Sequence, residues 1–197
     1  MAQLRASDGG VLPLDDARWH ADVDHWERGV LDGLPGPVLD VGCGPGRVVV
    51  DLARRGVPSL GVDPAPAAVN LARRRGAAVL QRSVFDRLPG EGRWGAVVLF
   101  DGNVGIGGDA VRLLARCACL IRPSGTVLVE VARPGSGWAT RRVRVEHGSR
   151  AGPWFGWVIV GADAIGAVAT AAGLRVTRTE RAGERWFARL ERCDAGR

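Results

Sequence analysis

Lysine is absent from the sequence, so arginine supplies all 27 basic residues that offset the 21 acidic ones. We attribute this bias to nucleotide composition. No run of apolar residues is long enough to cross a bilayer, and the N-terminal stretch M-A-Q-L-R-A-S-D-G-G lacks the apolar core of a secretory signal. We therefore expect a cytoplasmic protein without membrane contact. The four cysteines include no C-x-x-C pair, so the sequence predicts neither a disulfide nor a metal site.

The formal net charge of +6 raises the question of a nucleic-acid partner. The arginines are scattered, at positions such as Arg54, Arg73 and Arg141, and no aromatic residues alternate with them. A solvated surface explains this pattern better than a nucleic-acid interface does, so we expect no nucleic acid as partner. At 197 residues, the chain is long enough for one domain with a sizeable core.

One glycine-rich stretch dominates the first half of the chain. It reads V-L-D-V-G-C-G-P-G-R and begins at Val38, so it combines a short apolar run with three glycines at alternate positions: Gly42, Gly44 and Gly46. Glycine has no Cβ and adopts positive φ readily, which lets a ligand lie directly against the backbone. The pattern predicts a strand that turns tightly into a helix. A dinucleotide fingerprint would need glycine where Arg47 stands, so that site is excluded.

An acid two residues before the first glycine, Asp40, completes the pattern. The stretch resembles motif I of the class I S-adenosylmethionine-dependent methyltransferases, in which Asp40 would face the amino group of the cofactor. The resemblance covers about Val38 to Leu190. It implies a Rossmann-like α/β fold: a doubly wound sheet of seven strands, mostly parallel, in the order 3-2-1-4-5-7-6 with strand 7 antiparallel, plus an N-terminal helix and a small inserted hairpin.

The same resemblance implies one methyltransferase domain over residues 1–197. We divide it into an N-terminal cap helix (1–36), a cofactor-binding half (38–132), an inserted hairpin that forms the acceptor wall (133–161), and a C-terminal helix and hairpin (162–197). The pattern of the chain predicts further strands over 59–63, 77–81, 94–100, 122–131, 174–180 and 185–191, and helices over 48–55, 64–75, 110–121 and 162–172.

Asp63 ends the second predicted strand, where a carboxylate can accept hydrogen bonds from both ribose hydroxyls of a nucleoside. It also precedes a helix, which it could cap. Related proteins carry an acid followed by a small residue at Ser83 and Val84, beside the adenine; here the acid is missing, and Ser83 offers a hydroxyl instead. The predicted residues that contact S-adenosylmethionine are Asp40, Gly42, Cys43, Gly44, Gly46, Asp63, Pro64, Ser83, Val84, Asp101 and Asn103.

Before motif I, Asp15 or Asp16 could cap a helix that runs to about Leu31. Its apolar residues recur at helical spacing and predict a buried stripe: Trp19, Val23, Trp26 and Val30. His20 and Asp24 are four residues apart on one face of this helix, where they form either a surface pair or a polar pair that looks into a pocket.

A second glycine-rich stretch, D-G-N-V-G-I-G-G-D, follows the predicted strand 94–100. In an open α/β sheet, this loop would leave strand four beside strand one, where ligands bind. Asp101 and Asn103 are therefore either pocket residues near the transferable methyl group or parts of a structural turn. Asp109 is expected to cap the next helix.

Two short strands, 141–146 and 157–160, are predicted around the turn H-G-S-R-A-G-P. The aromatic residues nearby either line an apolar acceptor pocket or pack in the core: Trp138, Trp154, Phe155 and Trp157. His147 could act as a general base or be an ordinary surface histidine.

The sequence thus predicts methyl transfer from S-adenosylmethionine to a small-molecule acceptor by in-line displacement. The candidate proton acceptors are His20, Asp101 and His147. Two alternatives stay open at this point: a methyltransferase acting on RNA or protein, and a non-catalytic subunit that only binds S-adenosylmethionine.

Overall fold

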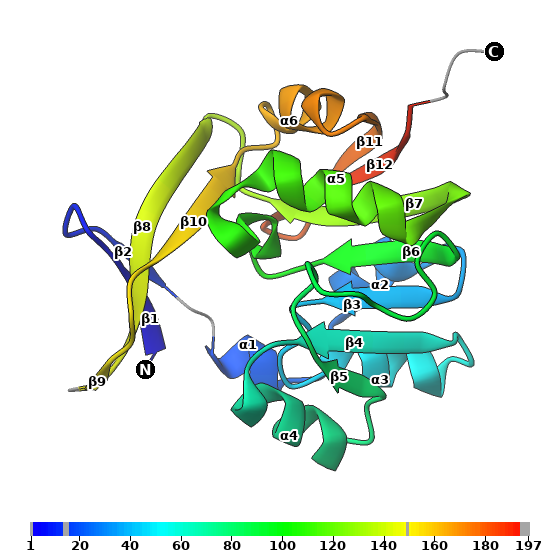
Figure 1. Ribbon diagram of the computed structural model, residues 1–197, viewed down its shortest axis with the longest axis horizontal. Coiled ribbons are helices and arrows are strands. Elements are labelled where there is room, and N and C mark those ends of the chain that lie inside the picture. Colours follow the sequence, from blue (N-terminus) through cyan, green and yellow to red (C-terminus); the bar gives the residue numbers. More distant parts are fainter. Residues whose placement is uncertain (1, 14–15, 149, 194–197) are drawn as a thin grey trace.

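The main sheet has the predicted seven strands. The computed structural model describes residues 2–13, 16–148 and 150–193, and the strand order of the main sheet is β11-β12-β7-β6-β3-β4-β5 (Figure 1). Neighbouring strands are parallel from β7 to β5, while β12 is antiparallel to both β7 and β11. The strands are β3 (Val38–Val41), β4 (Ser59–Asp63), β5 (Val79–Gln81), β6 (Trp94–Leu99), β7 (Ile121–Val131), β11 (Leu174–Ala182) and β12 (Arg185–Arg192). The predicted order and the antiparallel seventh strand are confirmed.

Helices cover both faces of this sheet, because its central strands are apolar on both sides. Alternate residues of β6 show the division: Val97 packs with the side chains of α5 and α6, whereas Val98 packs with those of α2 and α3. The helices are α1 (Asp16–His20), α2 (His25–Leu31), α3 (Arg47–Arg54), α4 (Pro66–Arg74), α5 (Ala110–Leu120) and α6 (Ile165–Ala171). Burial of each of these valines stabilises the fold by roughly 1.5–3 kcal/mol.

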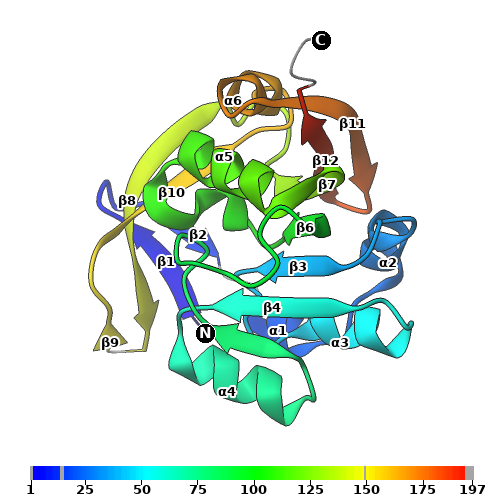
Figure 2. The same ribbon diagram turned by 45° about the vertical axis from the view of Figure 1, so that its right-hand side comes forward.

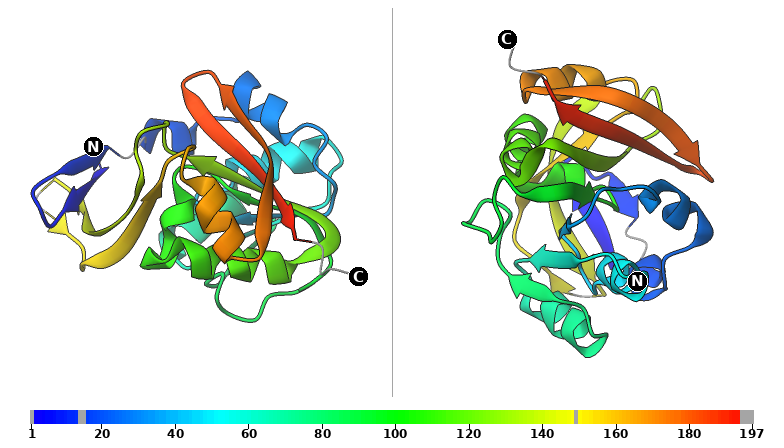
Figure 3. Two further views of the ribbon diagram at one scale, coloured as in Figure 1. Left: turned by 90° about the horizontal axis from the view of Figure 1, so that it is seen from above. Right: turned by 90° about the vertical axis from the view of Figure 1, so that its right-hand side faces the viewer.

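A second, smaller sheet stands over the carboxyl ends of the parallel strands, toward which the arrowheads of β3, β4 and β6 point (Figures 1 and 2). Its order is β10-β8-β1-β2, with β9 paired to β8. Its strands are β1 (Ala2–Ala6), β2 (Val11–Pro13), β8 (Trp138–His147), β9 (Arg150–Ala151) and β10 (Phe155–Val160). The inserted hairpin is therefore present and longer than predicted. Viewed from above, the small sheet projects to one side of the main sheet (Figure 3).

The N-terminal segment differs from the expectation of a cap helix. Residues 2–13 form β1 and β2, and β1 pairs antiparallel with β8 from Ala2, opposite His147, to Ala6, opposite Val143. Leu4, Ala6 and Val143 are buried together, with Trp157 packed against them. The start of the chain is thus an integral part of the small sheet.

The single helix predicted up to Leu31 is also wrong. The chain leaves α1 after His20 and enters α2 at His25, because Asp24 has the extended backbone of an N-cap. Its side chain accepts a hydrogen bond from the Glu27 amide, and Glu27 bonds back to the Asp24 amide, which makes a capping box. His20 and Asp24 therefore do not share one helix face. Trp26, predicted to be buried, is 50% exposed, whereas Val23 and Val30 are buried as expected. Asp15 lies outside the described residues.

Candidate cofactor site

The loop between β3 and α3 has the tight geometry that its glycines predict. Gly42, Gly44 and Gly46 all have positive φ, between 52° and 79°. A Cβ on Gly42 would stand 2.6 Å from Nδ2 of Asn103, and a Cβ on Gly46 would stand 2.8 Å from the Cβ of Ala77. A Cβ on Gly44 would meet no heavy atom within 4 Å. Gly42 and Gly46 are thus required for packing inside the protein, and Gly44 alone faces open space.

Asp63, at the end of β4, is fixed against this loop. Its Oδ2 atom accepts a hydrogen bond from the Gly44 amide at 3.0 Å, and Oδ1 accepts one from the Ala65 amide at 2.8 Å. Asp63 does not cap α4, because Ala65 is the N-cap of that helix and no side chain caps it. Each carboxylate oxygen of Asp63 can still accept a second donor from a ligand. Pro64, the next residue, is exposed.

Asp40, in the middle of β3, is the most unusual carboxyl group of the site. It is 3% exposed, and among the residues that the structure describes, nothing donates a hydrogen bond to its side chain. Burial raises the pKa of Asp40 to about 7, with Arg47 opposing the rise and the carboxylates of Asp101, Asp63 and Glu27 adding to it. A carboxyl group that accepts no hydrogen bond from the protein keeps its lone pairs for a donor on a ligand.

Five charged side chains form a connected group beside the glycine loop, and we call them the charged cluster: Glu27, Arg47, Asp101, Glu130 and Arg185. They come from α2, α3, the end of β6, β7 and β12. Three carboxylates face two guanidinium groups, so the cluster carries one excess negative charge when all are ionised. These residues meet only in the folded protein, since Glu27 and Arg185 are 158 positions apart in the sequence.

Arg47 and Arg185 share their carboxylate partners. Arg47 donates to Glu27 and, through Nη2, to both oxygens of Asp101 at 2.9 and 2.7 Å. Arg185 donates to Glu27, to Glu130 and, at 3.4 Å, to Asp101. Burial would raise the pKa of Glu27, but the bonds from the two arginines hold that pKa below its usual value.

Asp101 adopts a left-handed backbone, with φ of 55°, and is the one non-glycine residue of the described chain with positive φ. Burial raises the pKa of its carboxyl group, while Arg47 opposes the rise. The expectation that Asp101 accepts a proton stays a prediction, and its bonds to two arginines disfavour that role. Backbone strain of this kind is typical of sites where the surrounding structure fixes the conformation.

The segment after Asp101 holds the glycine loop from the other side. Asn103 begins a 3-10 helix (Asn103–Gly108), and its Nδ2 atom donates to the carbonyls of Val41 and Gly42 at 3.0 and 2.9 Å. The side-chain amide of Asn103 therefore holds the glycine loop in place, whether or not it also contacts a ligand. Asp109 caps α5 as predicted, since its side chain accepts from the Arg112 amide.

Ser83, Val84 and Cys43 occupy the flanks of the site. The hydroxyl of Ser83 accepts a hydrogen bond from the Phe85 amide at 3.2 Å, and the Ser83 amide donates to the side chain of Asp86. Ser83 and Asp86 therefore belong to one turn. Val84 is buried. Cys43 is buried against Gly61, and burial raises the pKa of its thiol. The expected adenine contacts at Ser83 and Val84 stay predictions.

The two candidate histidines come from elements other than those that form the glycine loop and the charged cluster. His20 is exposed at the end of α1, and its carbonyl accepts from Arg75. His147 ends β8 opposite Ala2 and Arg150, at the tip of the small sheet where β9 is seen in Figure 1. The side chain of His147 lies outside the described part of the structure.

The aromatic residues of the inserted hairpin divide into two groups. Trp157 lies against the 3-10 segment, since a Cβ on Gly105 would stand 2.6 Å from its ring and one on Gly102 would stand 3.8 Å away. Phe155 contacts Trp157 edge to face, with ring centroids 6.1 Å apart. Trp138 and Trp154 are 49% and 36% exposed, and Arg144 lies over the Trp154 ring. Only Trp157 packs with a buried cluster.

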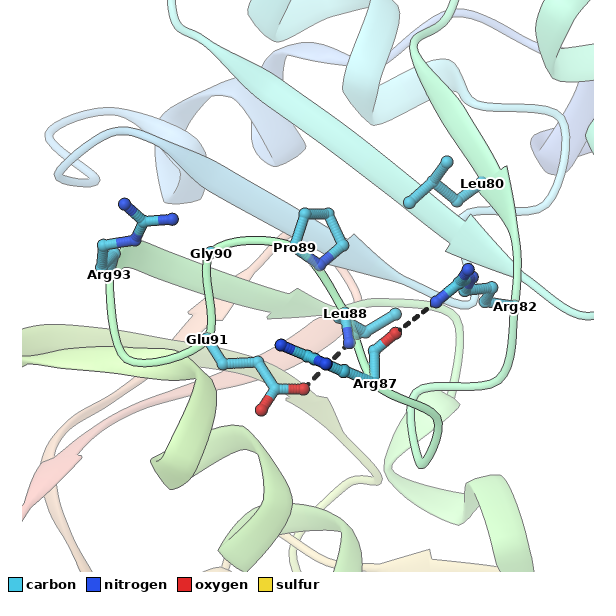
Figure 4. A pocket seen from close by; sticks show the side chains of 8 residues that line it. All are labelled: Leu80, Arg82, Arg87, Leu88, Pro89, Gly90, Glu91 and Arg93. Atoms are coloured by element: carbon cyan, nitrogen blue, oxygen red, sulfur yellow. Dashed lines mark hydrogen bonds between the residues drawn. The ribbon is translucent and has the colours of Figure 1, made fainter.

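Two hollows of the surface lie away from the glycine loop. A cavity of about 720 Å³ is formed by the connection from β5 to β6, which contains no helix, and Figure 4 shows its side chains. It is lined by Leu80, Arg82, Arg87, Leu88, Pro89, Gly90, Glu91 and Arg93. An adjoining hollow of about 410 Å³ reaches Pro37 and Trp94, near the amino ends of β3 and β6. Neither is lined by the glycine loop, by Asp63 or by the charged cluster.

Among the residues that the structure describes, no group of three or more His, Cys, Asp or Glu side chains could hold a metal ion. All four cysteines are free. No helix within the described residues combines the length and the apolar character that crossing a membrane requires.

Comparison with known proteins agrees with this geometry. Residues 38–125 match the profile of a methyltransferase domain. No curated protein matches the chain by sequence. The fold is similar to that of an S-adenosylmethionine-dependent methyltransferase from Bacteroides fragilis in complex with S-adenosylhomocysteine, with a TM-score of 0.80, 20% identity, and coverage of 98% of this chain and 87% of that one.

Two further solved structures are similar over most of this chain. One is a 1,6-didemethyltoxoflavin N1-methyltransferase from Burkholderia thailandensis, with a TM-score of 0.62 and 20% identity over 84% of this chain and 74% of that one. The other is an O-methyltransferase from neocarzinostatin biosynthesis bound to 1,4-dihydroxy-2-naphthoic acid, with a TM-score of 0.60 and 27% identity over 79% of this chain and 49% of that one.

Proposed function

We propose that the protein is a class I S-adenosylmethionine-dependent methyltransferase, as the match of residues 38–125 to a methyltransferase domain supports, and that it methylates a small molecule whose apolar part lies against the small sheet. The observation that carries the proposal is Gly44: it is the one glycine of the loop over which a ligand has room, and its amide donates to the carboxylate of Asp63 at the end of β4. The Asp40 carboxyl group, on β3, is near enough to Asp63 for the charge of Asp63 to raise the pKa of Asp40.

The residues of the site fit S-adenosylmethionine as follows. The backbone at Gly44 supports the cofactor, with Gly42, Cys43 and Gly46 shaping the loop. Asp63, which keeps unused lone pairs, accepts the ribose hydroxyls. Asp40, which lacks a protein partner, accepts a hydrogen bond from the amino group of the cofactor. Further contacts are assigned to Pro64, Ser83, Val84, Asp101 and Asn103.

When bound, S-adenosylmethionine supplies a methyl group on a positively charged sulfur, for in-line displacement by the acceptor. The task left to the protein is alignment of the acceptor, which lowers the barrier by about 7–11 kcal/mol in well-oriented reactions. The excess negative charge of the charged cluster favours a cationic ligand, because charges attract more strongly in a buried site than in water. Asp40, when ionised, adds a second negative charge beside Arg47.

The acceptor is assigned to the space between the glycine loop and the small sheet. Trp157 borders the 3-10 segment at Gly105 and carries Phe155 beside it, so an aromatic surface faces the carboxyl edge of the main sheet. Aromatic side chains of this kind bind flat apolar molecules. Two similar structures hold such compounds, 1,6-didemethyltoxoflavin and 1,4-dihydroxy-2-naphthoic acid, which supports a small-molecule acceptor here.

Of the three candidate proton acceptors, only Asp101 belongs to the charged cluster beside the glycine loop. Its carboxylate already accepts from Arg47 and Arg185. We therefore propose an acceptor that needs no strong base: a neutral amine, whose lone pair attacks the methyl group directly and whose product ammonium then loses its proton to water, or an acidic phenol that is already ionised. His20 and His147 stay candidates for the general base if the acceptor molecule does need one.

The proposal is tested by calorimetric titration of the protein with S-adenosylmethionine and S-adenosylhomocysteine. Gly44→Val should abolish binding, because the new side chain occupies the space assigned to the cofactor. Gly56→Val is the matched control: Gly56 also has positive φ and no heavy atom within 4 Å of an added Cβ, but it lies at the far end of α3. Both variants should lose about 1–2 kcal/mol of stability from backbone strain.

Loss of binding in Gly44→Val alone supports the proposal. A Gly44→Val protein that is folded and binds as tightly as Gly56→Val would refute it. Turnover is then measured as S-adenosylhomocysteine formed with a panel of flat aromatic amines and phenols. Tight binding without turnover on any acceptor would favour a binding subunit over an enzyme.

A further inference from the structure

Arg185 is the most connected member of the charged cluster, although it lies far along the chain from the glycine loop. It is the first residue of β12, and all three of its side-chain nitrogens are used. Nε and Nη2 donate to Glu130, Nη1 donates to Glu27, and Nη2 also reaches Asp101 at 3.4 Å. The planar fork of arginine binds both oxygens of Glu130 and still reaches two further carboxylates, whereas a lysine cannot form the two-pronged bond.

The guanidinium of Arg185 also packs over two phenylalanine rings. It lies 5.4 Å from the ring centroid of Phe100 and 5.1 Å from that of Phe187, and the two rings contact each other. The side chain of Arg185 is 10% exposed. Its position is thus fixed by packing as well as by charge, so the carboxylates that it binds are fixed too.

A chain of contacts leads from Arg185 to the glycine loop. Glu130, which Arg185 binds, accepts a hydrogen bond from the backbone amide of Asp101. Asp101 is thereby held in its left-handed conformation at the point where the chain leaves β6. Two residues later, Asn103 donates to the carbonyls of Val41 and Gly42. The orientation of Asp101 therefore decides where Asn103 fastens the loop.

Arg185 also acts on the opposite side of the loop. It shares Glu27 with Arg47, the residue that follows the last glycine and begins α3. Arg47 in turn binds both oxygens of Asp101. The loop is consequently enclosed between two links that both pass through Arg185, one by way of Glu130 and one by way of Glu27.

On the basis of the proposed function, we propose that Arg185 is a positioning residue of the cofactor site: through Glu130, Asp101 and Glu27 it sets the glycine loop for S-adenosylmethionine. The C-terminal hairpin then contributes to cofactor affinity without touching the cofactor. The N-terminal helix α2 contributes in the same way through Glu27.

The chain offers a matched control in Arg189, on the same strand. Arg189 also ties β12 to α2, since its Nη2 atom donates to the carbonyl of Val30 at 2.7 Å, but no hydrogen bond or ion pair links it to a member of the charged cluster. Substitution of either arginine removes a tether between α2 and β12. Only substitution of Arg185 removes the link to Asp101.

The test compares Arg185→Met, Arg185→Lys and Arg189→Met by calorimetric titration with S-adenosylhomocysteine and by urea unfolding. We expect Arg185→Met to weaken binding by about tenfold or more, since small misplacements of a site are costly. Arg185→Lys, which keeps the charge and loses the fork, should bind with intermediate affinity. Arg189→Met should bind like the wild-type protein even if its stability falls.

Equal affinity in all folded variants would overturn the positioning role, and so would an equal loss in Arg185→Met and Arg189→Met. If Arg185→Met does not fold, Glu130→Gln replaces it: the amide is neutral and has one accepting oxygen, so it cannot bind Nε and Nη2 of Arg185 through two oxygens as Glu130 does. Weaker binding is expected, and wild-type affinity would overturn the role. A wild-type protein that binds neither cofactor form would refute the proposed function instead, which keeps the two failures distinguishable.

Discussion

The buried carboxyl group of Asp40 should make the affinity for S-adenosylmethionine depend on pH. Burial raises its pKa to about 7 in the protein alone, so at pH 5.5 the group is almost entirely protonated and neutral. A cationic ligand next to Asp40 favours the ionised form and lowers this pKa. Binding must therefore release a proton, and affinity must rise as the pH rises toward 7.

The magnitude follows from that pKa. If the pKa of Asp40 falls below about 5 in the complex, the dissociation constant should decrease roughly tenfold to twentyfold between pH 5.5 and pH 7, which is about 1 to 2 kcal/mol. At pH 7 roughly half a proton should leave for each cofactor bound. An α-amino group in model peptides titrates at about 7.7–8.0, so an amino group of this kind on the cofactor stays largely protonated in this range.

The assay is calorimetric titration at several pH values, repeated at pH 7 in two buffers of different ionisation enthalpy to count protons. Asp40→Asn is the control, because the amide keeps the shape of the side chain and cannot titrate. The difference between the two proteins isolates the titration of Asp40 together with its electrostatic coupling to its neighbours. The reasoning is refuted if the wild-type protein and Asp40→Asn show the same pH dependence.

Four further outcomes are expected. Asp40→Asn should be more stable than the wild-type protein at pH 8 by up to about 4 kcal/mol and no more stable at pH 4, because a carboxyl group with a raised pKa loses stability as the pH rises to that pKa; urea unfolding at both pH values checks this. Asp63→Ala should weaken S-adenosylhomocysteine binding by about 1–3 kcal/mol, and unchanged affinity in calorimetry would remove Asp63 from the site. Asn103→Ala should also weaken binding, measured in the same way, because the carbonyls of the glycine loop lose their donor. Trp157→Ala should raise the KM for the acceptor and leave cofactor affinity unchanged, whereas the exposed Trp138→Ala should change neither constant in a turnover assay.

The main sheet could be predicted from the sequence because its strands carry local signals. The apolar runs before Asp40, Asp63 and Asp101 end in acids or glycines, and the motif around Gly44 ties the chain to a known strand order. The predicted boundaries differ from the structure by one or two residues at most of these strands. Local pattern and resemblance to a family pointed to the same fold.

The small sheet could be predicted only in part. Its inserted hairpin has strand-forming residues, but β1 and β2 are short and β1 pairs with a strand more than a hundred residues away, such as Gln3 with Glu146. No local pattern indicates such a partner. The sequence did contain a signal for the break between α1 and α2, namely Asp24 followed three residues later by Glu27, which is the spacing of a capping box.

The charged cluster was missed for a similar reason. The residues next to Glu27 and Arg185 in the sequence do not indicate that either side chain is buried beside a cofactor. For Arg47, the sequence indicates only that the dinucleotide fingerprint, which needs glycine at that position, is absent. Their importance arises from burial, which makes every carboxylate require a partner. That requirement becomes visible only when the fold brings α2, β6 and β12 together.

The central claim is that a ligand lies over Gly44 between the carboxyl groups of Asp40 and Asp63. A crystal structure of the protein with S-adenosylhomocysteine tests it most directly. The account predicts the ribose hydroxyls within hydrogen-bond distance of Asp63 and the amino group on the side of Asp40. Finding the compound in the cavity between β5 and β6, with the space over Gly44 filled by protein side chains, would contradict it.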